Sequence, residues 1–111
     1  MTTLSVSVRD RGDPGAVDGE SVTVTVVGEL DIATVPRFTA RLGELIRRGQ
    51  FRELVLNLSG LTFIDAGGLR ALAEVRRRVE QQDATLVLEG VPPQMQRLIQ
   101  IIGPARQFRL R

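Results

Sequence analysis

The 111-residue chain contains no cysteine, histidine, lysine, tyrosine or tryptophan. Without cysteine, neither a disulfide framework nor a thiolate metal site is possible. Without histidine, imidazole acid–base chemistry and the usual zinc ligands are excluded. Only carboxylates and hydroxyls then remain as candidate nucleophiles or general bases. We therefore expect a protein that is not an enzyme, with no catalytic residue, no metal site and no cofactor.

The charge is nearly balanced, although the calculated pI is about 10.9. All 15 basic residues are arginines against 13 acidic ones, and few groups titrate between the carboxylates and arginine, so a net charge of only +2 persists over a wide pH range. The run Arg76–Arg78 would spread around a helix beside acidic residues, with no aromatic platform for bases. This pattern predicts a solvated helix face and no nucleic-acid partner.

Long apolar runs are also missing. No stretch approaches the roughly 20 residues of a membrane span, and residues 1–5 lack the pattern of a signal peptide. We therefore expect a cytoplasmic protein without direct membrane insertion. The length and the 42% hydrophobic content fit a single domain over residues 1–111 with its own core.

Apolar periodicity changes along the chain between the strand and helix types. The strands are predicted at residues 4–8, 21–27, 54–58 and 85–89, with an edge strand or packed tail at 108–110. The helices are predicted from Thr34 to about Gly49, from Asp65 to about Glu80, and over residues 94–102. Thr34 is expected to cap the first helix, with Pro36 in its first turn.

Strands that alternate with helices predict an α/β fold. We expect a small mixed, largely parallel sheet of four to five strands, in which the first two strands supply an antiparallel edge. Three or more helices are expected to pack mainly on one face of the sheet.

The junction Phe63-Ile64-Asp65-Ala66-Gly67-Gly68-Leu69 places an acid and three small residues where a helix begins. Asp65 suits an N-cap, because its carboxylate can accept the free N–H groups of the first turn. Each glycine there costs about 0.5–1 kcal/mol relative to alanine. We expect the glycines to make room for another backbone. The spacing does not match a phosphate-binding loop or a dinucleotide fingerprint.

A second acidic junction, Gly28-Glu29-Leu30-Asp31, also ends a predicted strand. The carboxyl ends of parallel strands share one rim of the sheet, so Asp31 and Asp65 are expected near each other. A divalent ion between them is one reading, but two carboxylates supply few ligands for such an ion. Two separate loop or cap carboxylates are the favoured reading.

Three stretches together resemble the STAS domain, and most closely the stand-alone bacterial anti-sigma factor antagonists: VGELDIATVPRF (27–38), ELVLNLSGLTFIDAGGLRAL (53–72) and ATLVLEGVPPQMQRLIQIIG (84–103). The loop at residues 9–21 is longer than this family leads us to expect. The resemblance implies a protein that binds an anti-sigma factor, a histidine-kinase-like ATPase with serine kinase activity, and so releases a sigma factor. It also implies a serine phosphatase that reverses phosphorylation of the antagonist.

The family's phosphoacceptor position corresponds to Ala66, which has no hydroxyl, and Gly67 follows it. The chain is then either a permanently binding-competent antagonist or one controlled in another way. Nearby hydroxyls are those of Ser59, Thr62 and Thr34, which we expect to serve the backbone. An alternative phosphosite at one of these three residues is the second reading.

The resemblance implies that the partner binds the rim around the second junction. The predicted partner-binding residues are Asp31, Thr34, Asp65, Ala66, Gly67, Gly68, Leu69 and Arg70. A bulky residue at position 68 is expected to weaken docking and to leave the fold mostly intact. The alternative functions are a structural subunit of a lipid ABC transporter complex, another STAS scaffold, and a small-ligand-binding module near the two aspartates.

Overall fold

The computed structural model describes residues 3–10, 21–49, 51–101 and 108–111. Its elements are β1 (Leu4–Asp10), β2 (Ser21–Leu30), α1 (Val35–Arg48), β3 (Glu53–Ile64), α2 (Ala66–Glu80), β4 (Thr85–Glu89), α3 (Pro93–Ile101) and β5 (Arg109–Leu110). The long loop expected at residues 9–21 lies mostly outside the described residues.

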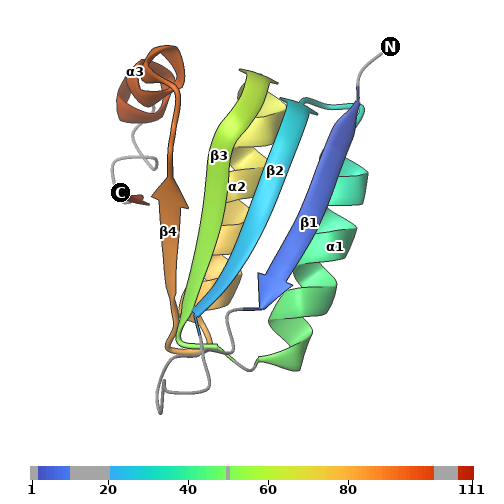
Figure 1. Ribbon diagram of the computed structural model, residues 1–111, viewed down its shortest axis with the longest axis vertical. Helices are drawn as coiled ribbons and strands as arrows, with labels where there is room; N and C mark the ends of the chain where they lie inside the picture. The colour runs from blue at the N-terminus through green and yellow to red at the C-terminus, as the bar shows by residue number, and fades with distance from the viewer. Residues whose placement is uncertain (1–2, 11–20, 50, 102–107) are drawn as a thin grey trace.

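The five strands form one sheet in the order β1-β2-β3-β4-β5. β1 runs antiparallel to β2, and the other neighbours pair in parallel. The helices α1 and α2 lie on the same face of the sheet, and α3 follows beyond the carboxyl end of β4 (Figure 1). The predicted α/β class, the antiparallel edge and the edge strand near residue 110 are confirmed. None of the described helices has the length and apolar character needed to cross a membrane.

The core lies between the sheet and the two helices. It combines Val22, Val24 and Val26 of β2, Leu54, Leu56 and Leu58 of β3, Leu86 and Leu88 of β4, Phe38, Leu42 and Ile46 of α1, and Leu72, Val75 and Val79 of α2. Each such side chain contributes about 1.5–3 kcal/mol when fully buried. The buried residues of both helices recur at helical spacing, as the apolar periodicity of the sequence indicates.

β3 is much longer than the predicted strand at 54–58, because it continues to Ile64. Ser59 and Gly60 interrupt the apolar pattern and conceal this continuation. The structure accommodates them with two register shifts against β2, at which β3 carries the extra residue. A Cβ at Gly60 would lie 3.0 Å from a methyl carbon of Val27, so the small residue lets the two strands stay paired. The extension brings Leu30 and Ile64 side by side at the rim.

The prediction of a solvated face at Arg76–Arg78 is wrong for Arg76. Its side chain is only 15% exposed, and its guanidinium carbon lies 5.6 Å from the ring centroid of Phe108. One of its nitrogens pairs with Glu80 at 3.6 Å. Arg78 is half-buried, and its guanidinium packs against Gly43 of α1. Of the three arginines, Arg77 alone is exposed, because the guanidinium groups of the other two lie against Phe108 and Gly43.

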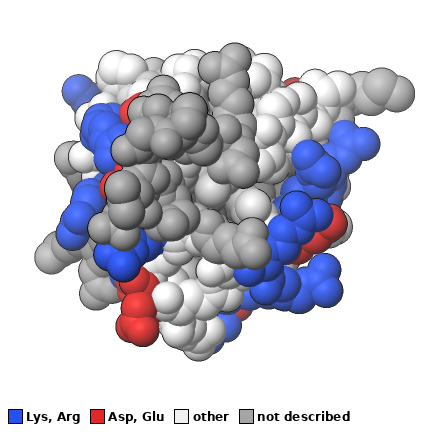
Figure 2. Space-filling model, turned by 60° about the horizontal axis from the view of Figure 1, so that its bottom comes forward, with Lys and Arg blue, Asp and Glu red and all other residues white. Residues whose placement is uncertain are grey.

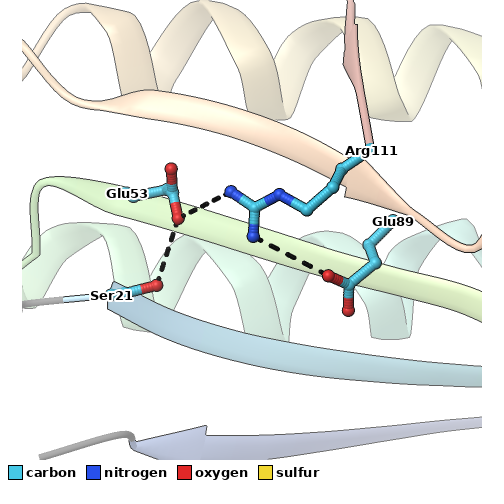
Figure 3. Close-up of polar contacts among 4 residues, drawn as sticks. All are labelled: Ser21, Glu53, Glu89 and Arg111. Carbon is cyan, nitrogen blue, oxygen red and sulfur yellow. Dashed lines mark hydrogen bonds and ion pairs between the residues drawn. The ribbon is translucent and has the colours of Figure 1, made fainter.

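On the face of the sheet away from α1 and α2, Arg111 joins three strands (Figure 3). Its guanidinium pairs with Glu53 of β3 at 3.1 Å and with Glu89 of β4 at 3.7 Å. The hydroxyl of Ser21 in β2 donates to the same Glu53 carboxylate at 3.3 Å. These contacts hold the end of the short β5 strand against the sheet.

Candidate functional site

The two acidic junctions meet at the rim where β2 and β3 end. Asp65 has an extended backbone and caps α2, because its Oδ1 accepts a hydrogen bond from the Gly68 N–H at 2.8 Å. Its Oδ2 accepts a second bond from the Ile32 N–H at 3.2 Å, across 33 positions of sequence. The predicted cap is confirmed, and the same carboxylate also holds the turn that precedes α1.

That turn depends on Asp31, which is buried. Its Oδ1 accepts the N–H groups of Ala33 and Thr34, each at 3.0 Å. Thr34 occupies the N-cap position of α1 but makes no side-chain capping bond, so the predicted cap is wrong. Its hydroxyl instead donates to the Glu29 carbonyl at 2.8 Å and accepts the Asp31 N–H at 3.0 Å. The hydroxyl therefore satisfies one backbone carbonyl and one backbone N–H of the turn.

Both aspartates therefore serve backbone N–H groups, which confirms the reading of cap and loop carboxylates. In the described parts of the chain, no three acidic, histidine or cysteine side chains gather closely enough to hold a metal ion. The two junctions are nevertheless close, since Asp65 bonds to the residue directly after Asp31.

The two glycines after Ala66 have different surroundings. A Cβ on Gly68 would lie 2.4 Å from the Leu30 carbonyl oxygen and 2.8 Å from a side-chain carbon of Ile64. Another backbone does come close, as predicted, but it belongs to the protein's own β2. The expectation that a bulky residue at position 68 would leave the fold mostly intact is therefore wrong. A Cβ on Gly67 would meet only the Asp65 carboxylate at 3.3 Å and Ile32 at 3.8 Å.

The predicted partner-binding residues divide by exposure. Ala66 and Arg70 are exposed, and Asp65 and Gly67 are partly exposed, whereas Asp31, Thr34, Gly68 and Leu69 are buried. The buried four set the shape of the rim. In the described structure, the surface that a partner can reach here is formed by the exposed and partly exposed residues and by neighbours that the sequence did not single out.

Those neighbours line a groove between the starts of α1 and α2, with a volume of about 350 Å³. Its walls are Ile32, Val35, Pro36 and Thr39 on one side and Gly67, Arg70, Ala71 and Glu74 on the other. Ile32 is 78% exposed, the largest exposed fraction among the exposed large hydrophobic side chains of the described residues. The spacing of Gly67, Ala71 and Glu74 at four and three residues is a signal that indicates one helix face.

The rim of the groove carries an ion pair on α2. Arg77 donates to Glu74 at 3.0 Å through its Nε, and through a second nitrogen. This hydrogen-bonded contact lowers the pKa of the Glu74 carboxyl and raises that of the Arg77 guanidinium. Glu74 is therefore charged at neutral pH, and the exposed Arg70 one turn before it places a cation at the same opening.

The hydroxyls of Ser59 and Thr62 both bond within the protein; the expected bond to the backbone is confirmed for Thr62 and is wrong for Ser59, whose hydroxyl donates to a side chain. Ser59 donates to the Asn57 side-chain oxygen at 2.7 Å, and Thr62 donates to the Gly28 carbonyl at 3.0 Å. Both residues lie on β3, in the part of the strand beyond the predicted range of 54–58. Neither hydroxyl lies at the start of α2.

A model of the STAS domain family matches residues 11–111, a range that includes both acidic junctions. The chain is 32% identical over 80 residues to an anti-sigma-B factor antagonist of Staphylococcus aureus, covering 72% of this chain and 73% of that one. It is 29% identical over 87 residues to an anti-sigma F factor antagonist of Lysinibacillus sphaericus, covering 78% and 74%. A crystal structure of an anti-sigma factor antagonist from Mycobacterium paratuberculosis matches with a TM-score of 0.80 at 23% identity, covering 97% of this chain and 85% of that one.

Proposed function

The chain belongs to the STAS domain family, and we propose that it acts in the cytoplasm as an anti-sigma factor antagonist, a non-enzymatic protein that binds an anti-sigma factor and so releases a sigma factor. The observation that carries this proposal is the match to curated antagonists over more than two thirds of the chain, at 32% identity for one of them. The lack of histidine, cysteine, lysine and tyrosine favours a binding role over a catalytic one.

The groove between α1 and α2 is the surface that suits a protein partner best. Its apolar walls and charged rim match the usual anatomy of an interface. Ile32 protrudes at its edge and would enter a pocket of the partner as an apolar anchor. Ala66 and Gly67 add no bulk at the start of α2, so the partner's backbone can approach the helix end closely.

Ala66 decides how such an antagonist is regulated. A phosphate at the first helical position would add about 1.5 to 2 negative charges beside the Asp65 carboxylate, at the edge of the contact. That charge would oppose binding in a partly desolvated interface. The methyl group of Ala66 cannot accept a phosphate. We therefore propose an antagonist that stays competent to bind its anti-sigma factor, a kinase-like ATPase, without a phosphatase that acts at this position.

Binding is tested first with two matched variants. Ile32→Asp places a charge at the groove, whereas Leu98→Asp places one on an equally apolar residue that is 41% exposed on α3. The protein is used to capture partners from the native cell extract, and the captured anti-sigma factor is then purified for calorimetry. We expect Ile32→Asp to lower the affinity at least tenfold, by the roughly 2 kcal/mol of an apolar hot spot, and Leu98→Asp to leave it unchanged.

The result is checked by the release of the sigma factor from its complex with the anti-sigma factor. Recovery of transporter subunits without an anti-sigma factor would replace the proposal with the structural-subunit alternative. Equal affinities for Ile32→Asp and the wild-type protein would show that the groove is not the binding surface.

The acceptor position is tested with Ala66→Ser and the captured kinase in the presence of radiolabelled ATP. We expect label on the Ala66→Ser variant and none on the wild-type chain. A variant that stays unlabelled while it binds the kinase would refute the assignment of position 66. Label on the wild-type chain would locate the switch at another hydroxyl.

A further inference from the structure

The two edges of the sheet are protected to different degrees in the described structure. An edge strand exposes unpaired N–H and C=O groups, which can pair with a strand of another molecule. β5 spans only Arg109–Leu110 and offers little to pair with. β1 spans seven residues and, among the residues that the structure describes, pairs with β2 alone. Some other feature must keep β1 from pairing if the protein is to stay apart from its own copies.

The register shows which backbone groups of β1 point outward. The Thr3 carbonyl accepts from the Glu29 N–H at 2.8 Å, so it points toward β2. Backbone groups alternate in direction along a strand. Leu4, Val6 and Val8 therefore direct both their N–H and their C=O away from β2, and these three residues form the free edge.

Two arginines of α1 occupy this edge. Arg37 donates from Nη1 to the Leu4 carbonyl at 3.1 Å, and Arg41 donates from Nη2 to the Val6 carbonyl at 3.2 Å. The spacing matches, because four helical residues rise about 6 Å and two strand residues rise about 6.8 Å. The two guanidinium groups thus follow successive outward carbonyls along β1.

We propose that Arg37 and Arg41 guard β1 against edge-to-edge pairing with the β1 strand of a second copy of this chain. They act in two ways. Each holds a carbonyl that an incoming N–H would need. An antiparallel pair of copies would also bring four guanidinium groups together, and like charges directly opposed are unfavourable. Figure 2 shows basic side chains on the side of the molecule where α1 lies, with acidic ones among them, and a second basic group on the opposite side.

A second copy is the occupant that fits this edge. A two-fold axis at Val6 would place Leu4 opposite the other copy's Val8, so the same outward groups would meet. Val8 is 42% exposed and extends the apolar edge beyond the two guarded carbonyls. Edge pairing would then join two five-stranded sheets into one continuous sheet.

The test removes the cations and keeps the apolar stems. In Arg37→Met/Arg41→Met, light scattering after gel filtration is expected to show a dimer that increases with concentration, whereas the wild-type protein does not self-associate through β1. Hydrogen exchange at the Val6 and Val8 amides is expected to slow at least tenfold in the dimer. The control, Arg47→Met/Arg97→Met, removes the same charge from two other exposed arginines and is expected to behave like the wild type.

A third change locates the contact. The Val8 N–H points outward, so adding Val8→Pro to the double variant removes a donor needed for pairing without breaking the ladder to β2. This addition is expected to restore the monomer. A folded double variant that stays monomeric at millimolar concentration overturns the proposal, as does a dimer that Val8→Pro leaves intact. If circular dichroism shows that the double variant is unfolded, the single variant Arg41→Met is judged by the same outcomes.

Discussion

Alanine at position 68 is expected to destabilise the fold, whereas alanine at the adjacent position 67 is expected to be nearly neutral. Both glycines lie in the first turn of α2, where the change to alanine by itself favours the helix by about 0.5–1 kcal/mol. The surroundings reverse the sign at one of them. The Cβ of Gly68→Ala would lie 2.4 Å from the Leu30 carbonyl oxygen, far inside ordinary contact.

The size of the destabilisation by Gly68→Ala depends on which element must shift to make room for the Cβ. Leu30 belongs to a parallel strand and cannot retreat, so the start of α2 must shift away from the sheet. Overpacking of this kind costs about 1–3 kcal/mol. The shift also strains the bond from Gly68 to Asp65, and a lost N-cap costs about 1 kcal/mol more. After subtracting the gain in helix propensity, we expect Gly68→Ala to lose about 1–3.5 kcal/mol of unfolding free energy.

The assay is urea unfolding followed by circular dichroism. An unchanged slope of the unfolding free energy against urea concentration checks two-state behaviour. For a domain of this size, the same loss lowers the melting temperature by roughly 5–15 °C. Gly67→Ala is the matched control, since the atom nearest to its Cβ is an Asp65 carboxylate oxygen at 3.3 Å, which a small shift of that side chain relieves, followed by Ile32 at 3.8 Å. Equal stability of the two variants would refute the steric argument for Gly68.

Three other changes test separate parts of the site. Ala66→Glu is expected to keep or slightly raise the melting temperature, because an acid in the first helical turn favours the positive helix end by about 0.3–1 kcal/mol. The same variant is expected to lose affinity for the anti-sigma factor in calorimetry. Asp65→Ala removes the bonds to Gly68 and Ile32, and its free energy of unfolding is expected to fall by about 1–2 kcal/mol in urea. Arg77 lowers the pKa of Glu74, so this pair stabilises the fold above the ordinary glutamate pKa and loses that effect as the pH falls through the lowered pKa. Both groups are exposed and screened, so the melting temperature of Glu74→Gln is expected to match the wild type at neutral pH in 0.15 M salt.

The sequence predicted those features that depend on neighbouring residues. The cap at Asp65 needs only an acid three residues before a free N–H, and the structure has that bond. The largely parallel sheet and its antiparallel edge also follow from the alternation of patterns along the chain. The motifs around residues 27–38 and 53–72 correctly indicated the family.

Features that depend on distant residues were missed or misread. The use of Gly68 could not be seen locally, because the atom that excludes a side chain there belongs to Leu30, 38 positions earlier. Thr34 has the type and position of a cap, yet the turn around Asp31 takes its hydroxyl for the backbone of Glu29. Arg76 is mostly covered because the ring of Phe108, 32 positions later, lies over its guanidinium.

The double use of the Asp65 carboxylate has a consequence for the kinetics of association. One oxygen fixes the start of α2, and the other fixes the turn before α1, so both walls of the groove are held in place before any partner arrives. A surface pre-organised in this way loses little conformational entropy when it is covered. Variants of the groove are therefore expected to differ mainly in dissociation rate, with association rates close to that of the wild type.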